Sequence, residues 1–254
     1  MPGRPFILSE TTWKAVDPTP YELAVLPWGA TEAHNYHLPY ATDTIQVVRV
    51  AAGAAQRAWG AGARVLVLPS VPFGSQTTQL DIKACINMNP STQAAVLADI
   101  ADSLDRQGIL KLCIVNGHGG NDFRQMIREL QPKTRVFLTM VNWYKIVDPK
   151  PHFDEPGDHA GELETSVMLH IAPETVLPLN EAGDGRERRF RIAALREGWA
   201  WAPRQWTQIS ADTGVGNPKR STAEKGKKYF DLVVERLSQF FIDLSKADLT
   251  KLYE

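Results

Sequence analysis

Cysteine is scarce in this sequence of 254 residues, which contains only Cys85 and Cys113. Two thiols, one of them inside an apolar run, do not form the disulfide framework of small secreted proteins, so we expect buried thiols in a reducing compartment. Long hydrophobic runs are also missing. No stretch approaches the ~20 apolar residues of a membrane-spanning helix, and MPGRPFILSE lacks a secretory apolar region. We therefore expect a cytoplasmic protein with no membrane partner.

An excess of one charge sign is missing as well. The 28 basic and 29 acidic residues give a formal net charge of -1, which provides no general attraction to a phosphate backbone. With 43% hydrophobic and 22% charged residues, the composition is that of an ordinary globular protein. We expect a single domain over residues 1–254 that does not bind nucleic acid.

Hydrophobic periodicity predicts strands that alternate with helices. The predicted helices cover 43–59, 91–107, a segment ending near 130, and 221–244, and the predicted strands cover 64–68, 110–115 and 134–141. This alternation favours a mainly parallel sheet with helices on both faces, that is, a three-layer α/β/α sandwich. Residues 181–217, rich in arginine, tryptophan and glycine, are predicted to form an excursion from the core.

Potential metal ligands follow the first apolar run, in TEAHNYHLPYATD at 31–43. In an extended segment, the side chains of Glu32 and His34 point to the same face because they are two residues apart. Asp43 lies at the start of a predicted helix, where a carboxylate can also serve as an N-cap. Each residue alone is more often solvated or capping, but together they suit a divalent metal.

The stretch NGHGGND at 116–122 follows a buried predicted strand and places His118 at its carboxyl end. Open α/β sheets bind ligands at the carboxyl ends of their strands, so His118 is expected at the same edge as Glu32 and His34. A phosphate-binding loop is the alternative interpretation. The stretch has neither G-x-G-x-x-G nor G-x-x-x-x-G-K-[ST], which disfavours that alternative.

A third stretch, GDHAGELETSVMLHI at 157–171, is predicted to be a helix that begins near His159. Glu164 falls within its apolar stripe, where a metal would compensate the cost of a buried carboxylate. Glu162 falls on the opposite side and is predicted to be a solvated surface acid. His159 is either a proton shuttle or a simple neighbour of the helix cap. The apolar stripe itself consists of Ala160, Leu163, Val167, Met168 and Ile171.

Together these motifs resemble the creatininase (creatinine amidohydrolase) family. The matching pieces, in order, are T-E-A-H at 31–34, H-L-P at 37–39, T-D at 42–43, N-G-H-G-G-N at 116–121 and H-A-G-E-L-E-T-S at 159–166. TGVGNPKRSTAEKGKKYF at 213–230 is similar to the family's C-terminal segment. The resemblance extends over most of the chain and implies the same sandwich fold.

The resemblance implies two divalent metal ions per chain, Zn²⁺ or Mn²⁺, with Fe²⁺ as a further option. Glu32 and His118 would bind one ion and His34 the other, with Asp43 bridging. Creatininase has a ligating glutamate where this chain has Gly120. Glu164 is expected to complete the second ion in its place. His37 is expected to orient a ligand rather than to be one.

The activity implied is hydrolysis of a non-peptide C–N bond, in a cyclic amide or formamide, by a hydroxide that bridges the metals. His159 would deliver a proton to the departing nitrogen. The expected partners are a small-molecule amide substrate and further copies of the chain, because family members commonly assemble as hexamers. A lactonase-type metallohydrolase, or a protein that binds metal or a metabolite without turnover, is the alternative.

Two departures from the family leave the substrate open. Residues 73–92 lack the H-x-x-F-P-G-T sequence of relatives, and Glu155 stands where creatininase has a tryptophan. Four tryptophans could line a planar pocket, cover a subunit interface or simply pack: Trp143, Trp199, Trp201 and Trp206.

Overall fold

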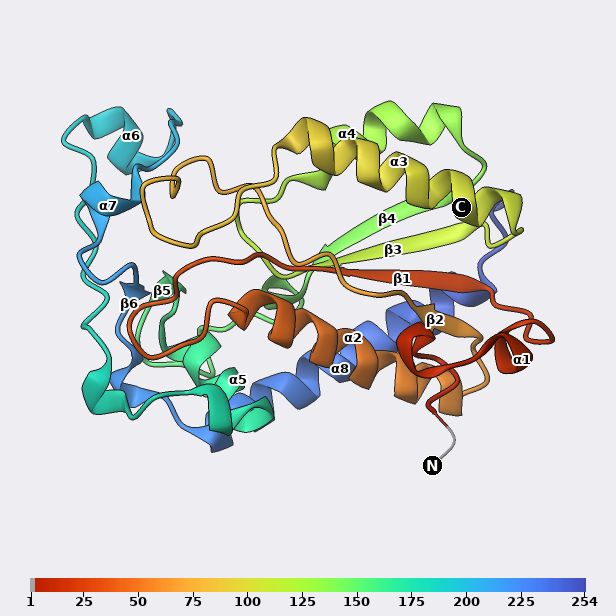
Figure 1. Ribbon diagram of the computed structural model, residues 1–254, viewed down its shortest axis with the longest axis horizontal. Coiled ribbons are helices and arrows are strands. Elements are labelled where there is room, and N and C mark those ends of the chain that lie inside the picture. Colours follow the sequence, from red (N-terminus) through yellow and green to blue (C-terminus); the bar gives the residue numbers. More distant parts are fainter. Residues whose placement is uncertain (1–2) are drawn as a thin grey trace.

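The computed structural model describes residues 3–254, which include a four-stranded parallel sheet (Figure 1). Its strands lie in the order β2 (Val65–Val67), β1 (Leu23–Trp28), β3 (Lys111–Asn116) and β4 (Phe137–Asn142). Every residue of β1 is buried, as expected of a strand covered on both faces. Trp28 is paired with Asn116, so β1 and β3 end at the same edge of the sheet.

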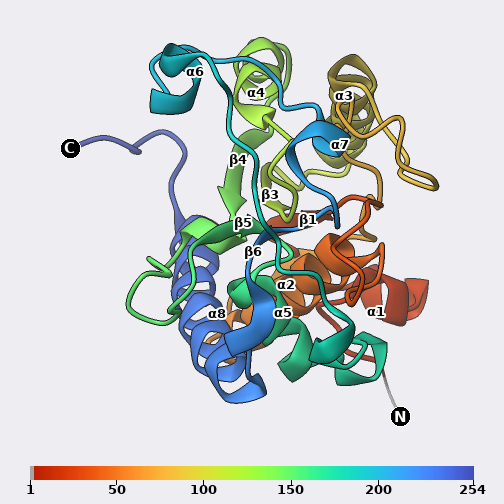
Figure 2. The ribbon, with the colours of Figure 1, turned by 90° about the vertical axis from the view of Figure 1, so that its left-hand side faces the viewer.

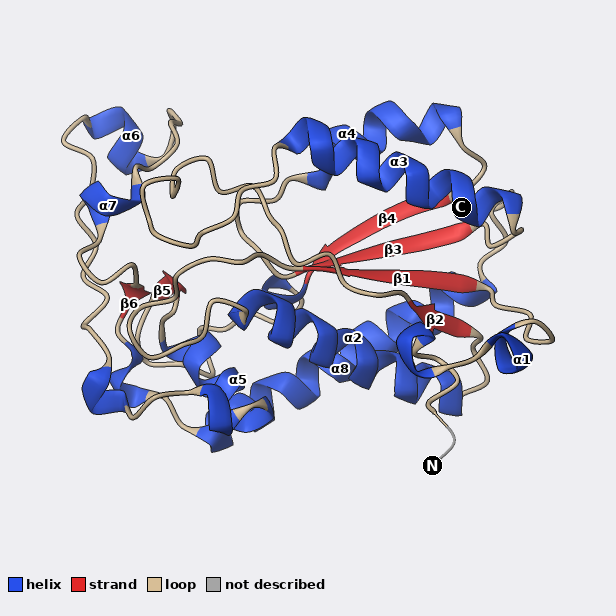
Figure 3. Ribbon diagram, in the orientation of Figure 1, coloured by secondary structure: helices blue, strands red, loops and turns tan. Residues whose placement is uncertain are grey.

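Helices cover both faces of this sheet (Figures 1 and 3). On one face lie α2 (Thr42–Gly60), α5 (Glu162–Ile171) and α8 (Ala223–Lys246), and on the other α3 (Pro90–Arg106) and α4 (Phe123–Leu130). Alternate residues of β1 supply the two cores. Leu23 and Val25 belong to the cluster with α2 and α8, whereas Leu26 packs with α3 and α4. The three-layer sandwich with a parallel sheet is confirmed.

A second, two-stranded sheet lies beyond the carboxyl ends of β1 and β3. It pairs β5 (Gly157–His159) with β6 (Val215–Gly216) in antiparallel fashion. Figure 2, which faces this end of the molecule, shows both strands in front of the larger sheet, close to α7 (Trp206–Ile209). The predicted excursion contains α6 (Ala193–Glu197), α7 and β6.

The remaining elements are short. An α-helix, α1 (Trp13–Val16), precedes β1. Single 3₁₀ turns occur at Leu8–Glu10, Gln131–Lys133, Trp143–Lys145, Pro173–Thr175, Leu179–Glu181 and Pro218–Arg220. Within residues 3–254, none of the helices is both long enough and apolar enough to cross a lipid bilayer.

One predicted helix boundary is wrong. The helix expected to begin near His159 begins at Glu162, and His159 is instead the last residue of β5. The cause is local, because Ala160 adopts φ +51°, in the left-handed region, and Gly161 is extended. This turn separates the strand from α5 and holds the imidazole of His159 apart from the helix.

Candidate metal centre

The loop after β1 carries Glu32 and His34, and both side chains are buried, with 1% and 0% exposure. Asp43, in the first turn of α2, is equally buried. It does not cap that helix, because the N-cap position is Ala41 and no side chain bonds there. Instead, Asp43 Oδ1 lies 3.1 Å from His34 Nε2 and Asp43 Oδ2 lies 3.1 Å from His118 Nδ1.

Three imidazoles share one arrangement. One ring nitrogen of each lies against a backbone carbonyl: His34 Nδ1 at 3.2 Å from Glu32 O, His118 Nε2 at 3.0 Å from Ser75 O, and His159 Nε2 at 2.8 Å from Ala33 O. A carbonyl only accepts, so these nitrogens carry the proton. In the neutral form of each ring, the other nitrogen then has a lone pair that faces the carboxylates. This is the tautomer that metal-binding histidines adopt.

The loop after β3 is held by two buried asparagines. Asn116 Oδ1 accepts from the backbone N–H of His118, and Asn116 Nδ2 donates to the carbonyl of His118. Asn121 Nδ2 donates to Asn116 Oδ1, while Asn121 Oδ1 accepts from the N–H of Ser75. These bonds fix His118 against the carboxyl end of β1.

Gly120 fits this loop only because it lacks a side chain. A Cβ there would lie 2.3 Å from Ser75 O and 2.5 Å from His118 Nε2, which are the two atoms of the bond that orients His118. A ligand side chain at this position is therefore incompatible with the present loop.

Glu164, on α5, brings a third carboxylate to His34. Its Oε2 lies 4.0 Å from His34 Nε2 and accepts the N–H of Ala160 at 2.5 Å. The left-handed turn at Ala160 thus directs this N–H group toward the Glu164 carboxylate. Glu164 is half-buried rather than fully enclosed.

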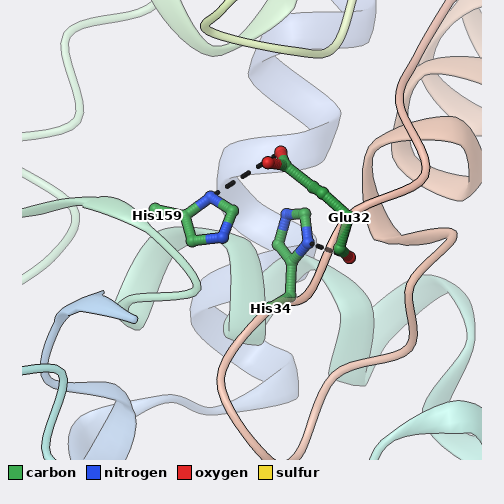
Figure 4. A group of neighbouring side chains, drawn as sticks. All are labelled: Glu32, His34 and His159. Atoms are coloured by element: carbon green, nitrogen blue, oxygen red, sulfur yellow. Dashed lines mark hydrogen bonds and ion pairs between the residues drawn. The ribbon is translucent and has the colours of Figure 1, made fainter. Parts of the chain in front are cut away.

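The six predicted site residues converge into three groups whose ligand atoms lie within 4.8 Å of one another. Two groups share Asp43, and the third contains His159, whose Nδ1 lies 3.9 Å from Glu32 Oε1 (Figure 4). The groups are Glu32 with Asp43 and His118, His34 with Asp43 and Glu164, and Glu32 with His34 and His159.

The charges of these groups suit divalent cations. Burial alone would lower the pKa of His34, but the carboxylates of Asp43 and Glu164 outweigh it and raise the pKa to about 10. Burial alone would lower the pKa of His118 too, but the carboxylates of Glu32 and Asp43 together outweigh it and hold that pKa well above its ordinary value. Burial raises the pKa of Glu164 to about 7. The buried carboxylates of Glu32 and Asp43, with the half-buried carboxylate of Glu164, therefore require positive charge nearby, and metal ions would supply it without protons on the imidazoles.

The structure also bears on the predictions for Glu162 and His37. Glu162, predicted to be a solvated surface acid, is 1% exposed, so that prediction is wrong. Its carboxylate accepts from the N–H groups of Asp154 and Glu155 and binds Lys225 of α8. His37 Nε2 lies 2.9 Å from Oγ1 of Thr165, the residue that follows Glu164 in α5.

The four tryptophans divide into two pairs. Trp143 is buried in the core, and Trp206 lies edge-on against the ring of His159, with centroids 5.0 Å apart. Trp199 and Trp201 are 76% and 86% exposed, so these two do not pack within the chain. Cys113 is buried as expected, whereas Cys85 is only half-buried.

Sequence reasoning missed the segment that covers the centre. Ser75 O orients His118, and Gln79 Nε2 donates to Glu32 Oε2. The sequence gives no positive indication of this role, because the segment only lacks the H-x-x-F-P-G-T sequence of relatives. Nothing in the sequence spacing of Trp206 links it to His159, and only the fold brings the two rings together.

Comparison with known proteins identifies the family to which the chain belongs. The model of the family Creatininase, described as creatinine amidohydrolase, matches residues 9–241. A mycofactocin precursor peptide peptidase from Mycobacterium ulcerans is 29% identical, over 86% of this chain and 84% of its own length. A creatinine amidohydrolase from Pseudomonas putida is 27% identical, over 66% of this chain and 73% of its own length.

Solved structures agree. A Bacteroides fragilis protein provisionally described as a creatinine amidohydrolase is 45% identical and superposes with a TM-score of 0.92 over 98% of both chains. A manganese form of creatininase and a Zn-Zn variant each give a TM-score of 0.79 at 22% identity, over 95% of this chain and 99% of theirs. The family model spans nearly the whole sandwich, the candidate ligands included. The chain therefore belongs to the creatininase family of hydrolases.

Proposed function

We propose that the chain is a dinuclear, metal-dependent amidohydrolase that cleaves the C–N bond of a small amide, such as a cyclic amide or a formamide. The observation that carries this proposal is the shared arrangement of the imidazoles of His34 and His118, the proposed ligands, and of His159, which faces the same carboxylates. Each holds one nitrogen on a backbone carbonyl and presents the other to buried carboxylates. Fixing buried imidazoles so that one nitrogen of each faces carboxylates costs free energy, and this arrangement is characteristic of metal ligands.

Glu32 and His118 would hold one ion, His34 and Glu164 the other, and Asp43 would contact both through its two oxygens. This set of carboxylates and imidazoles suits Zn²⁺ or Mn²⁺. Bound in this way, two divalent ions supply an acidified water and Lewis-acid stabilisation of a developing oxyanion.

His159 is proposed to move the proton. Its Nε2–H is fixed by Ala33 O, which leaves Nδ1 free to accept a proton from the attacking water and to pass it to the departing nitrogen. The C–O bond forms first and the C–N bond breaks when the resulting tetrahedral oxyanion collapses, so the proton taken from the water completes the amine product. Trp206 holds the ring from its outer face.

The relatives leave two substrate classes open. One is described as a creatinine amidohydrolase and another as a peptide peptidase, and both names denote attack on an amide carbonyl. Peptide hydrolysis is therefore the second candidate. A panel of lactams, formamides, lactones and short peptides separates these classes, and lactone hydrolysis alone would favour the lactonase alternative.

Metal analysis tests the proposal directly. After metal-replete expression, we expect about two transition-metal ions per chain and hydrolysis of at least one amide class. Fewer than about one ion per chain, with no rescue by added Mn²⁺ or Zn²⁺, contradicts the proposal. Tight binding of metal and ligand without turnover across the panel would instead identify a binding protein.

We also propose that the chain forms a homo-oligomer. Trp199 and Trp201 expose large apolar surfaces on the excursion, as does Ile192 at 63%. Side chains of this kind are enriched at subunit interfaces. Light scattering coupled to size exclusion should give a mass several times that of one chain, and replacing both tryptophans with serine should reduce it.

A further inference from the structure

Residues 73–87 fold back over the candidate metal centre. Ile86 N donates to Thr31 O at 3.0 Å and Tyr40 Oη donates to Lys83 O at 2.8 Å, which ties the segment to the loop that carries Glu32. From the other side, Trp206 N donates to Thr78 O at 3.1 Å. The segment is thus fixed at several points against the ligand loop.

Gln79, within this segment, binds a candidate ligand. It is 3% exposed, and its Nε2 donates to Oε2 of Glu32, which is itself 1% exposed. The other oxygen of Glu32, Oε1, lies 2.7 Å from His118 Nδ1. The amide therefore occupies one carboxylate oxygen and leaves the other facing the imidazoles.

Cys85 fixes the amide of Gln79 in turn. The thiol of Cys85 donates to Gln79 Oε1 at 3.4 Å, while its sulfur accepts the N–H of Ala33 at 3.3 Å. A carboxylate only accepts, so the side of the amide that faces Glu32 must be its NH₂ group. Thiol, amide and carboxylate therefore form one continuous chain of hydrogen bonds.

We propose that Gln79 is a positioning residue for metal binding, oriented by Cys85, that selects Oε1 of Glu32 as the ligand atom. This inference rests on the proposed function, because it assigns Glu32 to one of two ions. A hydrogen bond to the remaining oxygen of a ligating carboxylate fixes its rotation. The segment in which this chain departs from its family thus supplies a support for one metal ion.

The test measures metal affinity rather than turnover. Mn²⁺ is titrated into metal-free protein and free Mn²⁺ is followed by electron paramagnetic resonance. For Gln79→Met, which keeps length but removes the donor, we expect one of two Mn²⁺ sites to weaken by about 10–100-fold while the other is unchanged. Gln76→Met is the matched control, because Gln76 is buried in the same segment and its amide has no partner in residues 3–254.

Cys85 provides an independent test from behind the amide. Cys85→Ser keeps a donor and should retain affinity within about twofold, whereas Cys85→Ala should weaken the same site several-fold. If each Mn²⁺ site has the same affinity in Gln79→Met as in the wild type, the inference is overturned. A metal-free Gln79→Met protein that melts well below the wild type also overturns it, since Gln79 would then serve the fold. If the wild type binds no Mn²⁺, the proposed function fails instead.

Discussion

Asp43 is the residue that the two proposed ion positions would share, since its two oxygens face His34 and His118 separately. We predict that Asp43→Asn lowers kcat/KM by a factor on the order of a thousand, because the amide cannot supply two anionic oxygens. Amide hydrolysis and metal content should fall together. Asp99→Asn, on the exposed face of α3, is the control and should leave both within error. Full activity of Asp43→Asn would remove Asp43 from the centre.

The buried carboxylate of Glu162 depends on Lys225. Because Lys225 is the cationic partner of a fully buried acid, we predict that Lys225→Met lowers the free energy of unfolding by about 2 kcal/mol or more. Urea denaturation monitored by circular dichroism measures this change. Lys228→Met provides the comparison, because the Lys228–Glu224 pair is exposed and should contribute less than about 0.5 kcal/mol. Equal effects of the two substitutions would show that the burial of Glu162 is not compensated by Lys225.

These residues also show what sequence can and cannot predict. Glu32, His34 and His118 follow apolar strands, so their meeting at one edge follows from parallel topology alone. Gln79 and Glu162 lie 47 and 63 positions from their partners Glu32 and Lys225. No local pattern predicts pairing at that distance. Glu162 was misassigned because a helical projection ignores what packs against the first turn from α8.

At the scale of elements, Asp105 joins the end of α3 to the segment before β4. It accepts from the backbone N–H of Arg135 at 3.0 Å and from the guanidinium Nε at 2.7 Å. The backbone bond, followed by the side-chain bond, lowers the pKa of Asp105 below its ordinary value of 3.8. Folding therefore favours the ionised form, so this contribution is present above pH 3.8 and is lost as the pH falls through the folded pKa.

We predict that Asp105→Asn destabilises the protein at pH 7, and that the difference from the wild type shrinks as the pH falls below about 4. Urea midpoints at several pH values measure it. Asp102→Asn, whose pair with Arg106 is exposed on α3, should show a much smaller difference. A constant difference from pH 7 to pH 3 would show that the charge of Asp105 is not the cause.

The predicted helices match the observed ones because their hydrophobic periodicity extends over many residues. The helices expected at 43–59 and 91–107 occur at Thr42–Gly60 and Pro90–Arg106. The exception is the start of α5, where Ala160 adopts a left-handed φ that alanine rarely takes. Ala160 directly follows β5, which pairs with β6, more than fifty residues away in sequence. Propensity at Ala160 therefore predicts a helix, and tertiary structure overrides it.

At the scale of the whole molecule, two apolar cores flank the sheet, and the candidate centre lies outside both. We expect these cores to unfold together as one domain. Chelation should therefore abolish hydrolysis but leave one cooperative unfolding transition at a lower Tm. Metal at about 100 times its Kd should restore about 2.7 kcal/mol of stability for each site that it fills.

Calorimetry and circular dichroism, with and without chelator, measure this effect. Asp43→Asn serves as the control, because its Tm should respond little to added metal. Two separate transitions would instead divide the chain into two domains. Loss of helical circular dichroism on chelation would mean that the metal is required for folding.

The close approach at Gly120 has a consequence for how such a protein can change by single mutations. A substitution that introduces a carboxylate at 120 collides with Ser75 O and His118 Nε2 before it can reach any ion. The order of events is therefore constrained: the segment around Ser75 must move first, and only then is a longer side chain tolerated. Because the obstacle at 75 is a backbone oxygen, tolerance of a carboxylate at 120 should depend on changes that shift the backbone around Ser75 rather than on the side chain at 75.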